Sequence, residues 1–144
     1  MDSTVTEQDA PDASVLSERA IARGLVTMRP ETARAIAANE IKKGDVLAAA
    51  RFAAVQAAKE ADSFLPLIDS ASVRRVVVDF DVREGLIEVT VDATCSVEQS
   101  ARLRALSAAT AATLTIYDMC KSADRTMQIG PVSLVPPPFD HHPS

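Results

Sequence analysis

A carboxylate and an amine stand close together near the end of a long apolar run. The stretch TLTIYDMCKSAD, residues 113–124, places Asp118 and Lys121 three positions apart. On a helix, residues three apart share a face, so the two side chains can meet. In a desolvated cleft such a pair has shifted pKa values and can move protons, whereas on an open surface it is an ordinary ion pair. Spacing alone favours the surface ion pair.

A second polar group surrounds a glycine between two predicted helices. The stretch KKGDV contains Lys42, Lys43, Gly44 and Asp45. Backbone amides at the start of the second helix could hold an anion, with a lysine above it. A glycine that ends a helix and is flanked by lysines is also ordinary capping, and this simpler interpretation is favoured.

Two arginines and one aspartate complete the candidate set. Arg102 and Arg104 lie on opposite sides of a regular helix, although an extended approach to the helix would place both on one side. Cations at a helix start oppose the helix dipole, which favours an anion site or a subunit contact over a solvated surface. Asp69 follows FLPLI in a predicted turn, where local hydrogen bonding is the usual role of aspartate.

The rest of the chain predicts the elements that hold these residues. Strands are expected at 20–28, at 72–97 as an antiparallel hairpin with one wet face, and at 126–135. Helices are expected at 29–45, ending at Gly44, at 45–64 and at 98–124. The second helix has apolar residues on nearly every side, as a buried helix would. An α+β domain with long helices packed on an antiparallel sheet follows.

Both ends of the chain are predicted to be irregular. Residues 1–17 are acidic and contain proline, which is typical of a disordered arm. Residues 136–144 are rich in proline and predict a mobile tail. The folded domain is therefore expected at residues 18–135.

Composition narrows the class of protein. The 144 residues carry a net charge of -5, which argues against a general nucleic-acid binder. No apolar run is long enough to span a membrane, and the acidic N-terminus lacks signal-peptide features. Cys95 and Cys120 have neither metal-site nor disulfide-framework spacing. A reduced, cytoplasmic protein that needs no metal or redox cofactor is the simplest interpretation.

Six motifs occur in order along the chain: VTMRPET, KKGDVLAAAR, AAVQAAK, LPL, LTIYDMCK and IGPV. Together they resemble the cyclic pyranopterin monophosphate synthase family, the MoaC-type proteins of molybdenum cofactor biosynthesis. The resemblance implies a ferredoxin-like fold and a hexamer with active sites at subunit interfaces. It also implies rearrangement of 3',8-cyclo-7,8-dihydro-GTP into cyclic pyranopterin monophosphate with loss of pyrophosphate. Lys43, Asp118 and Lys121 match the family lysine, acid and base of that chemistry.

Other positions depart from the family pattern. After LPL the family carries Cys-His-Pro, and this chain has Ile68, Asp69 and Ser70. Where the family has two glutamates, this chain has Arg102 and Arg104, and no lysine follows IGPV. Guanidinium groups donate hydrogen bonds and cannot accept them, so they cannot replace carboxylates that hold a guanine-type edge.

Three functions are compatible with these residues. The charge change favours a repurposed, cofactor-independent lyase, cyclase or isomerase that acts on an anionic small molecule. Its acid–base groups are Lys43, Asp118, Lys121 and Asp69, and its substrate-binding groups are Arg102, Arg104 and Lys42. The alternatives are the family reaction itself, alone or with an intact MoaC-like paralogue, and a catalytically inactive assembly subunit. Neither a nucleic acid nor a membrane is expected as a partner.

Overall fold

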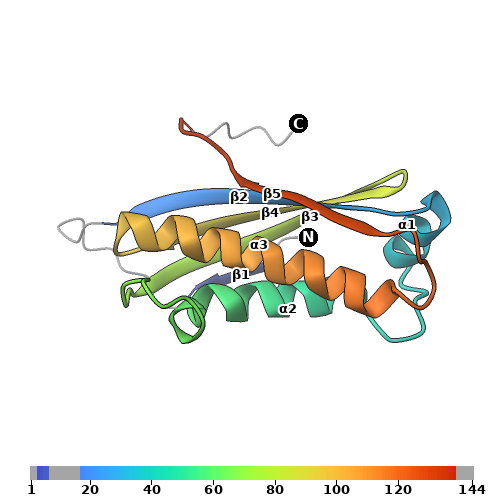
Figure 1. Ribbon diagram of the computed structural model, residues 1–144, viewed down its shortest axis with the longest axis horizontal. Helices are drawn as coiled ribbons and strands as arrows, with labels where there is room; N and C mark the ends of the chain where they lie inside the picture. Colours follow the sequence, from blue (N-terminus) through green and yellow to red (C-terminus); the bar gives the residue numbers. More distant parts are fainter. Residues whose placement is uncertain (1–2, 7–16, 139–144) are drawn as a thin grey trace.

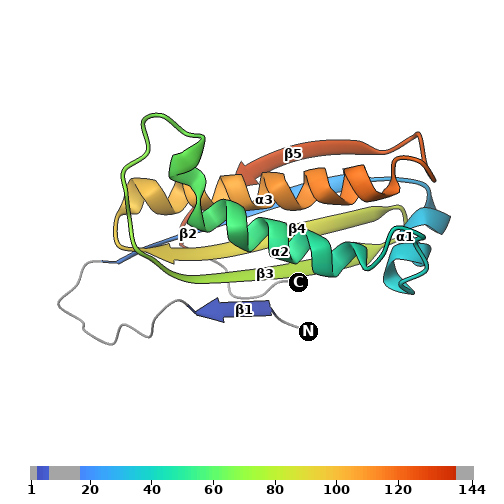
Figure 2. The same cartoon turned by 90° about the horizontal axis from the view of Figure 1, so that it is seen from below.

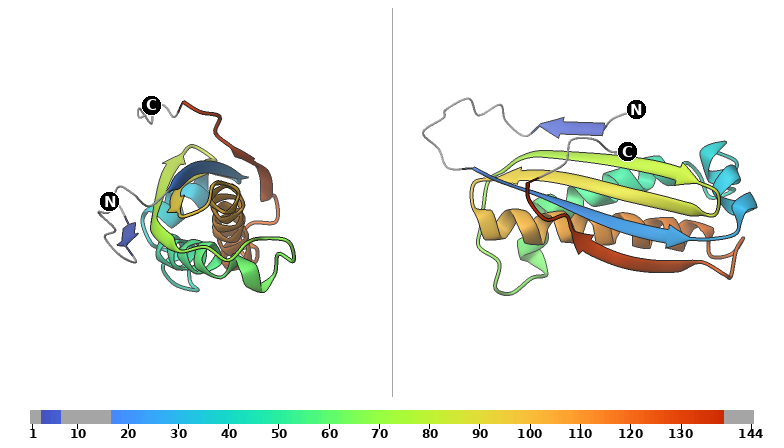
Figure 3. Two further views of the ribbon diagram at one scale, coloured as in Figure 1. Left: turned by 90° about the vertical axis from the view of Figure 1, so that its left-hand side faces the viewer. Right: turned by 90° about the horizontal axis from the view of Figure 1, so that it is seen from above.

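An antiparallel sheet carries two long helices on one of its faces (Figures 1 and 3). The computed structural model describes residues 3–6 and 17–138 of the chain. Within them the strands are β1 (Ser3–Thr6), β2 (Glu18–Thr27), β3 (Val73–Arg83), β4 (Leu86–Cys95) and β5 (Gln128–Leu134). The strand order is β1-β3-β4-β2-β5, and every neighbouring pair is antiparallel.

The helices lie between the strands in sequence. They are α1 (Pro30–Ala37), α2 (Val46–Lys59) and α3 (Glu98–Cys120), with a short 3-10 turn, η1 (Ala61–Ser63), after α2. From β2 onward the chain runs strand, helices, two strands, helix, strand, with β4 lying between β2 and β3. This is the β-α-β-β-α-β connectivity of ferredoxin-like folds. The predicted α+β class and antiparallel sheet are confirmed.

Strand β4 shows how alternation builds the sheet. Every second side chain is buried beneath the helices: Ile87, Val89, Val91, Ala93 and Cys95. Residues between them lie on the opposite face, where Glu88 pairs with Arg23 at 3.0 Å and Asp92 with Arg19 at 2.7 Å. The hairpin of β3 and β4, with one wet face, is therefore confirmed.

Small residues let α3 approach the sheet closely. Its buried face is built mainly from alanines: Ala101, Ala105, Ala108, Ala109 and Ala112. On β2, a Cβ atom at Gly24 would lie 2.9 Å from Thr113 Cγ2 of α3. Any larger side chain at Gly24 would push the helix away, because contacts this short are strongly repulsive. The alanine-rich composition thus fixes a short distance between helix and sheet.

The prediction that α2 is buried on nearly every side is wrong for the single subunit. Only the residues spaced four apart are fully buried: Val46, Ala50, Ala54 and Ala58. They form one face, which packs against α3 and β3. Phe52, on another face, is 70% exposed. The apolar residues around α2 therefore leave an uncovered surface.

Helix α1 ends earlier than predicted. It stops at Ala37 rather than at Gly44, because Asn39 adopts a left-handed backbone with φ 57° and the Glu40 amide donates to the Ala35 carbonyl at 2.8 Å. Asparagine tolerates this conformation and commonly ends helices in this way. Residues 38–45 consequently form a loop that carries both lysines of KKGDV.

The two ends of the chain differ from expectation in one place. Residues 3–6, predicted as part of a disordered arm, form β1, which pairs with β3 so that Ser3 lies opposite Val78. The remaining predicted arm, apart from Ser17, lies outside the described residues. Of the predicted mobile tail, residues 136–138 belong to no helix or strand, and the last six lie outside the described part.

In the part of the chain that the structure describes, no helix combines the length and apolar character needed to cross a membrane.

Candidate active site

The pair at the end of α3 is joined by hydrogen bonds. Lys121 Nζ donates to the carboxylate of Asp118 and, at 3.1 Å, to the Asp118 carbonyl oxygen. Both side chains are exposed. The hydrogen bond and charge of Lys121 hold the pKa of Asp118 below its usual value, and the charge of Lys43 lowers it further. Asp118 is therefore an ionised carboxylate beside two amines.

The loop before α2 brings Lys43 to this pair. Gly44 has φ 131°, a conformation that favours glycine, and a Cβ atom there would lie 3.9 Å from Met119 Cε on α3. Lys43 lowers the pKa of the Asp118 carboxyl and of the Cys120 thiol, so its charge acts on the end of α3. Figures 1 and 2 show the loop between α1 and α2 at the same end of the molecule as the end of α3. The three residues that match the family thus lie at one end of the same subunit, with the charge of Lys43 acting on Asp118.

The same loop supports the capping interpretation of KKGDV. The Asp45 carboxylate accepts a hydrogen bond from the Ala48 amide at 3.1 Å and caps the start of α2. Since this amide is already bonded, it is not available to an anion. Lys42 is exposed on the loop beside Lys43.

Cys120 lies beneath the cluster and is fully buried. Burial raises the pKa of its thiol to about 11, with the charge of Asp124 adding to the rise and that of Lys43 opposing it. A thiol with this pKa stays protonated at neutral pH and is a poor nucleophile. Cys120 therefore packs as a small apolar side chain.

Arg104 has a structural role that the sequence did not predict. It is only 1% exposed. Its guanidinium donates to Ser100 Oγ at 2.7 Å, to the carbonyls of Ala58 and Lys59 at 2.8 and 3.1 Å, and to that of Asp69 at 3.4 Å. Helix carbonyls at a C-terminus lack partners within the helix and carry partial negative charge. Arg104 therefore caps α2 from α3 and ties down the loop that follows.

The other candidates at this end of α3 are exposed. Arg102 forms an ion pair with Glu98, one turn earlier on the same helix. Arg102 and Arg104 thus point to opposite sides, as the regular-helix interpretation predicts. The Asp69 side chain is exposed on the loop before β3. Arg104 lies fourteen residues before Asp118, about 21 Å along the helix axis at 1.5 Å per residue. Within one subunit, these candidates do not join the cluster.

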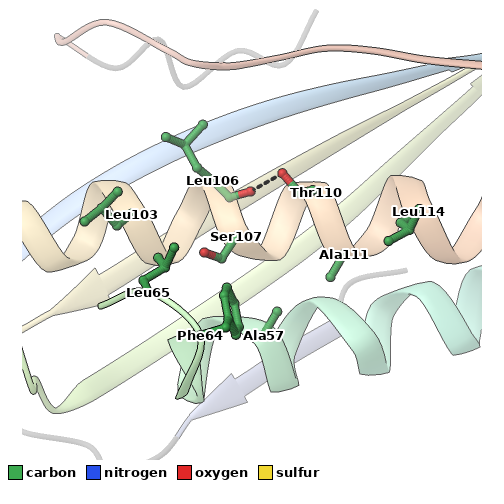
Figure 4. Close-up of a pocket in the computed structure, with 9 residues that line it drawn as sticks. All are labelled: Ala57, Phe64, Leu65, Leu103, Leu106, Ser107, Thr110, Ala111 and Leu114. Atoms are coloured by element: carbon green, nitrogen blue, oxygen red, sulfur yellow. Dashed lines mark hydrogen bonds between the residues drawn. The ribbon is translucent and has the colours of Figure 1, made fainter. Parts of the chain in front are cut away.

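An apolar groove lies between the two ends of α3, on the outer side of α2 and α3 (Figure 4). It has a volume of about 440 Å³. Its lining is Ala57, Phe64, Leu65, Leu103, Leu106, Ser107, Thr110, Ala111 and Leu114. Leu114 and Phe64 remain 56% and 54% exposed. This groove was not predicted, because the apolar pattern of α2 indicated a covered helix.

Asp124, just after α3, was also missed. It is 1% exposed, and burial by itself would raise its pKa. Hydrogen bonds from Thr126, from the Arg29 amide and from Thr32 outweigh burial and hold the pKa well below the usual value for aspartate. The sequence signal available was the spacing of Asp124 and Thr126, which suits an aspartate-initiated turn.

Within residues 3–6 and 17–138, no three His, Cys, Asp or Glu side chains are grouped as metal ligands. The expectation that the protein needs no metal or redox cofactor stays a prediction.

Fold and cluster together define an α+β protein with an exposed carboxylate bonded to one lysine and influenced by the charge of a second. The sequence profile of the MoaC family matches residues 8–136. Over 118 residues the chain is 44% identical to a protein of Roseiflexus sp. (strain RS-1) named cyclic pyranopterin monophosphate synthase, covering 81% of this chain and 75% of that protein. Proteins of the same name from Chloroflexus aurantiacus and Magnetococcus marinus are 39% and 37% identical over 129 residues, 88% of this chain and 79% of each relative. The chain belongs to the MoaC family.

Proposed function

We propose that this protein catalyses the cyclic pyranopterin monophosphate synthase reaction. The observation that supports it best is that Lys43, Asp118 and Lys121, which match the family motifs, are exposed at one end of the molecule. Lys121 is bonded to Asp118 there, and the charge of Lys43 acts on the pKa of Asp118. The name of relatives up to 44% identical supports the same reaction. The substrate is 3',8-cyclo-7,8-dihydro-GTP, and the products are cyclic pyranopterin monophosphate and pyrophosphate.

The position of Arg104 weakens the case for a repurposed enzyme. That case depends on two guanidinium groups that turn the inherited cleft toward anionic ligands. Arg104 is buried and bonded to backbone carbonyls, while Arg102 is paired with Glu98. Neither guanidinium acts on the pKa of Asp118, whereas Lys121 and Lys43 do. The cluster of one subunit therefore keeps the character that the family motifs imply.

The cluster suits the charge and proton movements of this reaction. Forming a cyclic monophosphate requires a substrate hydroxyl to attack the α-phosphorus while the bond to pyrophosphate breaks. In the proposed reaction Asp118, ionised at neutral pH, accepts the hydroxyl proton. Lys43 and Lys121 carry the positive charge that stabilises the departing pyrophosphate oxygens. Protonation of the leaving group and deprotonation of the hydroxyl balance the step.

We further propose a homo-oligomer whose subunits complete the site. The exposed side of α3 carries Leu103, Ser107, Thr110, Leu114 and Tyr117, with spacings of four and three that alternate as in paired helices. Packing two copies of α3 antiparallel along this line would place the N-terminal half of one helix beside the C-terminal half of the other. The Arg104 end of one α3, with the Asp69 loop bonded to it, would then lie beside the Lys43 cluster of the other subunit. The separation of about 21 Å along one helix would no longer keep them apart. A hexamer built from such dimers is the assembly that we expect.

Conversion of the cyclised GTP substrate by the purified protein tests the reaction. Cyclic pyranopterin monophosphate and pyrophosphate should appear in equal amounts, and both should disappear in the Lys43→Ala variant. Arg34→Ala, which removes an exposed ion pair with Glu84, is the matched control and should behave as wild type. Absence of both products over a long incubation would rule the proposal out.

Cysteine cross-linking tests the dimer. Cys95 and Cys120 are buried, so new surface cysteines should dominate oxidation. Thr110→Cys, at the centre of the exposed line, should give a disulfide-linked dimer. Asp79→Cys, exposed on β3, is the control and should stay monomeric on a denaturing gel. Equal, weak cross-linking of both variants would argue against this packing.

A second candidate function remains the repurposed lyase, cyclase or isomerase. It is favoured by the exposed Asp69 and Arg102, which stand where the family has a histidine and a glutamate. It predicts no turnover of the cyclised GTP but Lys43-dependent turnover of another anionic small molecule. An inactive assembly subunit instead predicts a stable complex with an intact MoaC-like paralogue on co-expression.

A further inference from the structure

One buried carboxylate joins the two segments that carry the cluster. Asp124 Oδ2 accepts hydrogen bonds from the Arg29 amide at 2.9 Å and from Thr32 Oγ1 at 2.7 Å. Its Oδ1 accepts from the Thr126 amide at 2.8 Å and from Thr126 Oγ1 at 2.6 Å. Four donors thus converge on a side chain that is only 1% exposed. Such a group defines a single local geometry, because losing any partner leaves a buried polar atom unsatisfied.

The donors on one side belong to the start of α1. Arg29 is the residue that precedes α1, and Thr32 lies in its first turn. Asp124 therefore anchors the start of α1 from another part of the chain, through the amide of the residue before the helix and the side chain of Thr32. Helix α1 leads directly into the loop at residues 38–45 that carries Lys43.

Asp124 itself and its other donor, Thr126, belong to the segment that follows α3. The Asp124 amide donates to the Cys120 carbonyl at 3.0 Å, and that of Ala123 donates to the same oxygen at 2.9 Å. Lys121 lies inside this turn. The Arg29 guanidinium adds a bond to the Ala123 carbonyl at 2.6 Å. The start of α1 and the end of α3 are therefore held together from both directions.

Cys120 separates this anchor from the cluster. The charges of Asp124 and Lys43 act in opposite directions on the pKa of the Cys120 thiol. Asp124 lies beneath the surface, whereas Asp118, Lys121 and Lys43 are exposed. Asp124 thus supports the cluster without reaching the space in which a substrate would bind.

We propose that Asp124 is a positioning residue that fixes Lys43 and Lys121 relative to Asp118 by tying the start of α1 to the turn after α3. The description of the cluster as catalytic rests on the proposed function, but the tie itself does not. Two lysines on separate segments keep a constant distance from one carboxylate only if those segments cannot slide. A shift of about 1 Å at a reacting group can cost up to 100-fold in rate.

The test measures how strongly Lys43 acts on Asp118 and needs no substrate. Nuclear magnetic resonance titration gives the pKa of the Asp118 carboxyl with and without the Lys43→Ala change, and the difference is the coupling between the two residues. The coupling is measured in wild type, in Asp124→Asn and in Val89→Ala. Val89 is fully buried in β4, and its truncation destabilises the core without touching Asp124.

We expect Lys43→Ala to raise the pKa of Asp118 in wild type and in Val89→Ala. In Asp124→Asn the rise should be less than half as large. The same rise in wild type and Asp124→Asn, or no rise in wild type, would overturn the proposal. If Asp124→Asn does not fold, Thr32→Val removes one donor and should weaken the coupling, and an unchanged coupling there would also overturn it.

Turnover separates this inference from the proposed function. With the cyclised GTP substrate, folded Asp124→Asn should lose roughly 10-fold in kcat, while Val89→Ala should keep its kcat. Coupling that depends on Asp124 in a protein without turnover would retain the positioning role and reject the proposed reaction. Turnover that is unaffected by Asp124→Asn would retain the reaction and reject the positioning role.

Discussion

The two ends of α3 carry charged residues that serve opposite purposes. Near its start, Arg104 is buried, and neutral oxygens of α2 and the following loop surround its guanidinium. At its end, Asp118 and Lys121 are exposed, with Lys43 near them, and the buried Asp124 lies below. Arg104 uses its charge to join segments, whereas Asp118 and Lys121 present theirs to solvent. Burial and partners, not residue type, distinguish the structural charge of Arg104 from the exposed charges of Asp118 and Lys121.

The difference also explains how the family scaffold tolerates new residues. Arg104 stands where the family resemblance implies a glutamate. Its guanidinium caps the C-terminal end of α2, so this position has a structural contact. The end of α3 and the loop before α2 together keep all three residues that match the family motifs. A chain can therefore lose expected site residues at one end while the cluster at the other end stays intact.

Removing Lys43 should have the largest effect, which is a loss of turnover. We expect Lys43→Ala to lower kcat with the cyclised GTP by about 100-fold or more, the usual range for a lost acid–base or charge-stabilising group. Steady-state kinetics measure this effect, and sedimentation should give the wild-type mass. Full activity in the variant would remove Lys43 from the cluster.

Removing the charge of Asp124 should have an intermediate effect that depends on pH. The folded pKa of Asp124 is lowered, so its stabilisation is complete above its unfolded pKa of about 4 and is lost as the pH falls below that value. Asp124→Asn should lower the free energy of unfolding at pH 7 by about 2–4 kcal/mol. Urea unfolding at several pH values measures this change.

Between pH 5 and pH 3 the variant should lose less stability than wild type, because over this range the Asp124 carboxylate of wild type becomes protonated only in the unfolded chain. Two curves that stay parallel over this range would show that Asp124 does not have the lowered pKa on which the prediction depends.

Removing the ion pair of Arg102 should have the smallest effect. The pair with Glu98 is exposed on the surface of α3. Arg102→Gln should change the free energy of unfolding by less than about 1 kcal/mol, the usual limit for exposed pairs. Thermal or urea unfolding at low and high salt measures it. A larger loss that persists at high salt would place Arg102 in a buried contact between subunits.

Local patterns were enough to predict most of the fold. The alternation in β3 and β4 predicted the hairpin, and the long run before Cys120 predicted α3. The end of α1 was missed because the left-handed conformation of Asn39 is one choice among several that asparagine can make. The exposed face of α2 was missed because an apolar pattern does not reveal whether a neighbour covers it.

The site was predicted only where family motifs mark it. Lys43, Asp118 and Lys121 were identified by match, and only the structure brings Lys43 to the other two. Arg104 and Asp124 required contacts between residues far apart in sequence, such as Arg104 with Ala58 and Asp124 with Thr32. Nothing local distinguishes a buried arginine from an exposed one two positions earlier on the same helix.

The most direct test compares one charged residue from each end of α3 in the same two measurements. Asp118→Asn should lower turnover of the cyclised GTP by about 100-fold and leave the free energy of unfolding near the wild-type value. Arg104→Met should lower the free energy of unfolding by about 2–4 kcal/mol and leave the turnover of the folded protein near wild type. The reverse result, with folded Arg104→Met inactive and Asp118→Asn fully active, would contradict the assignment of chemistry to the C-terminal end of α3.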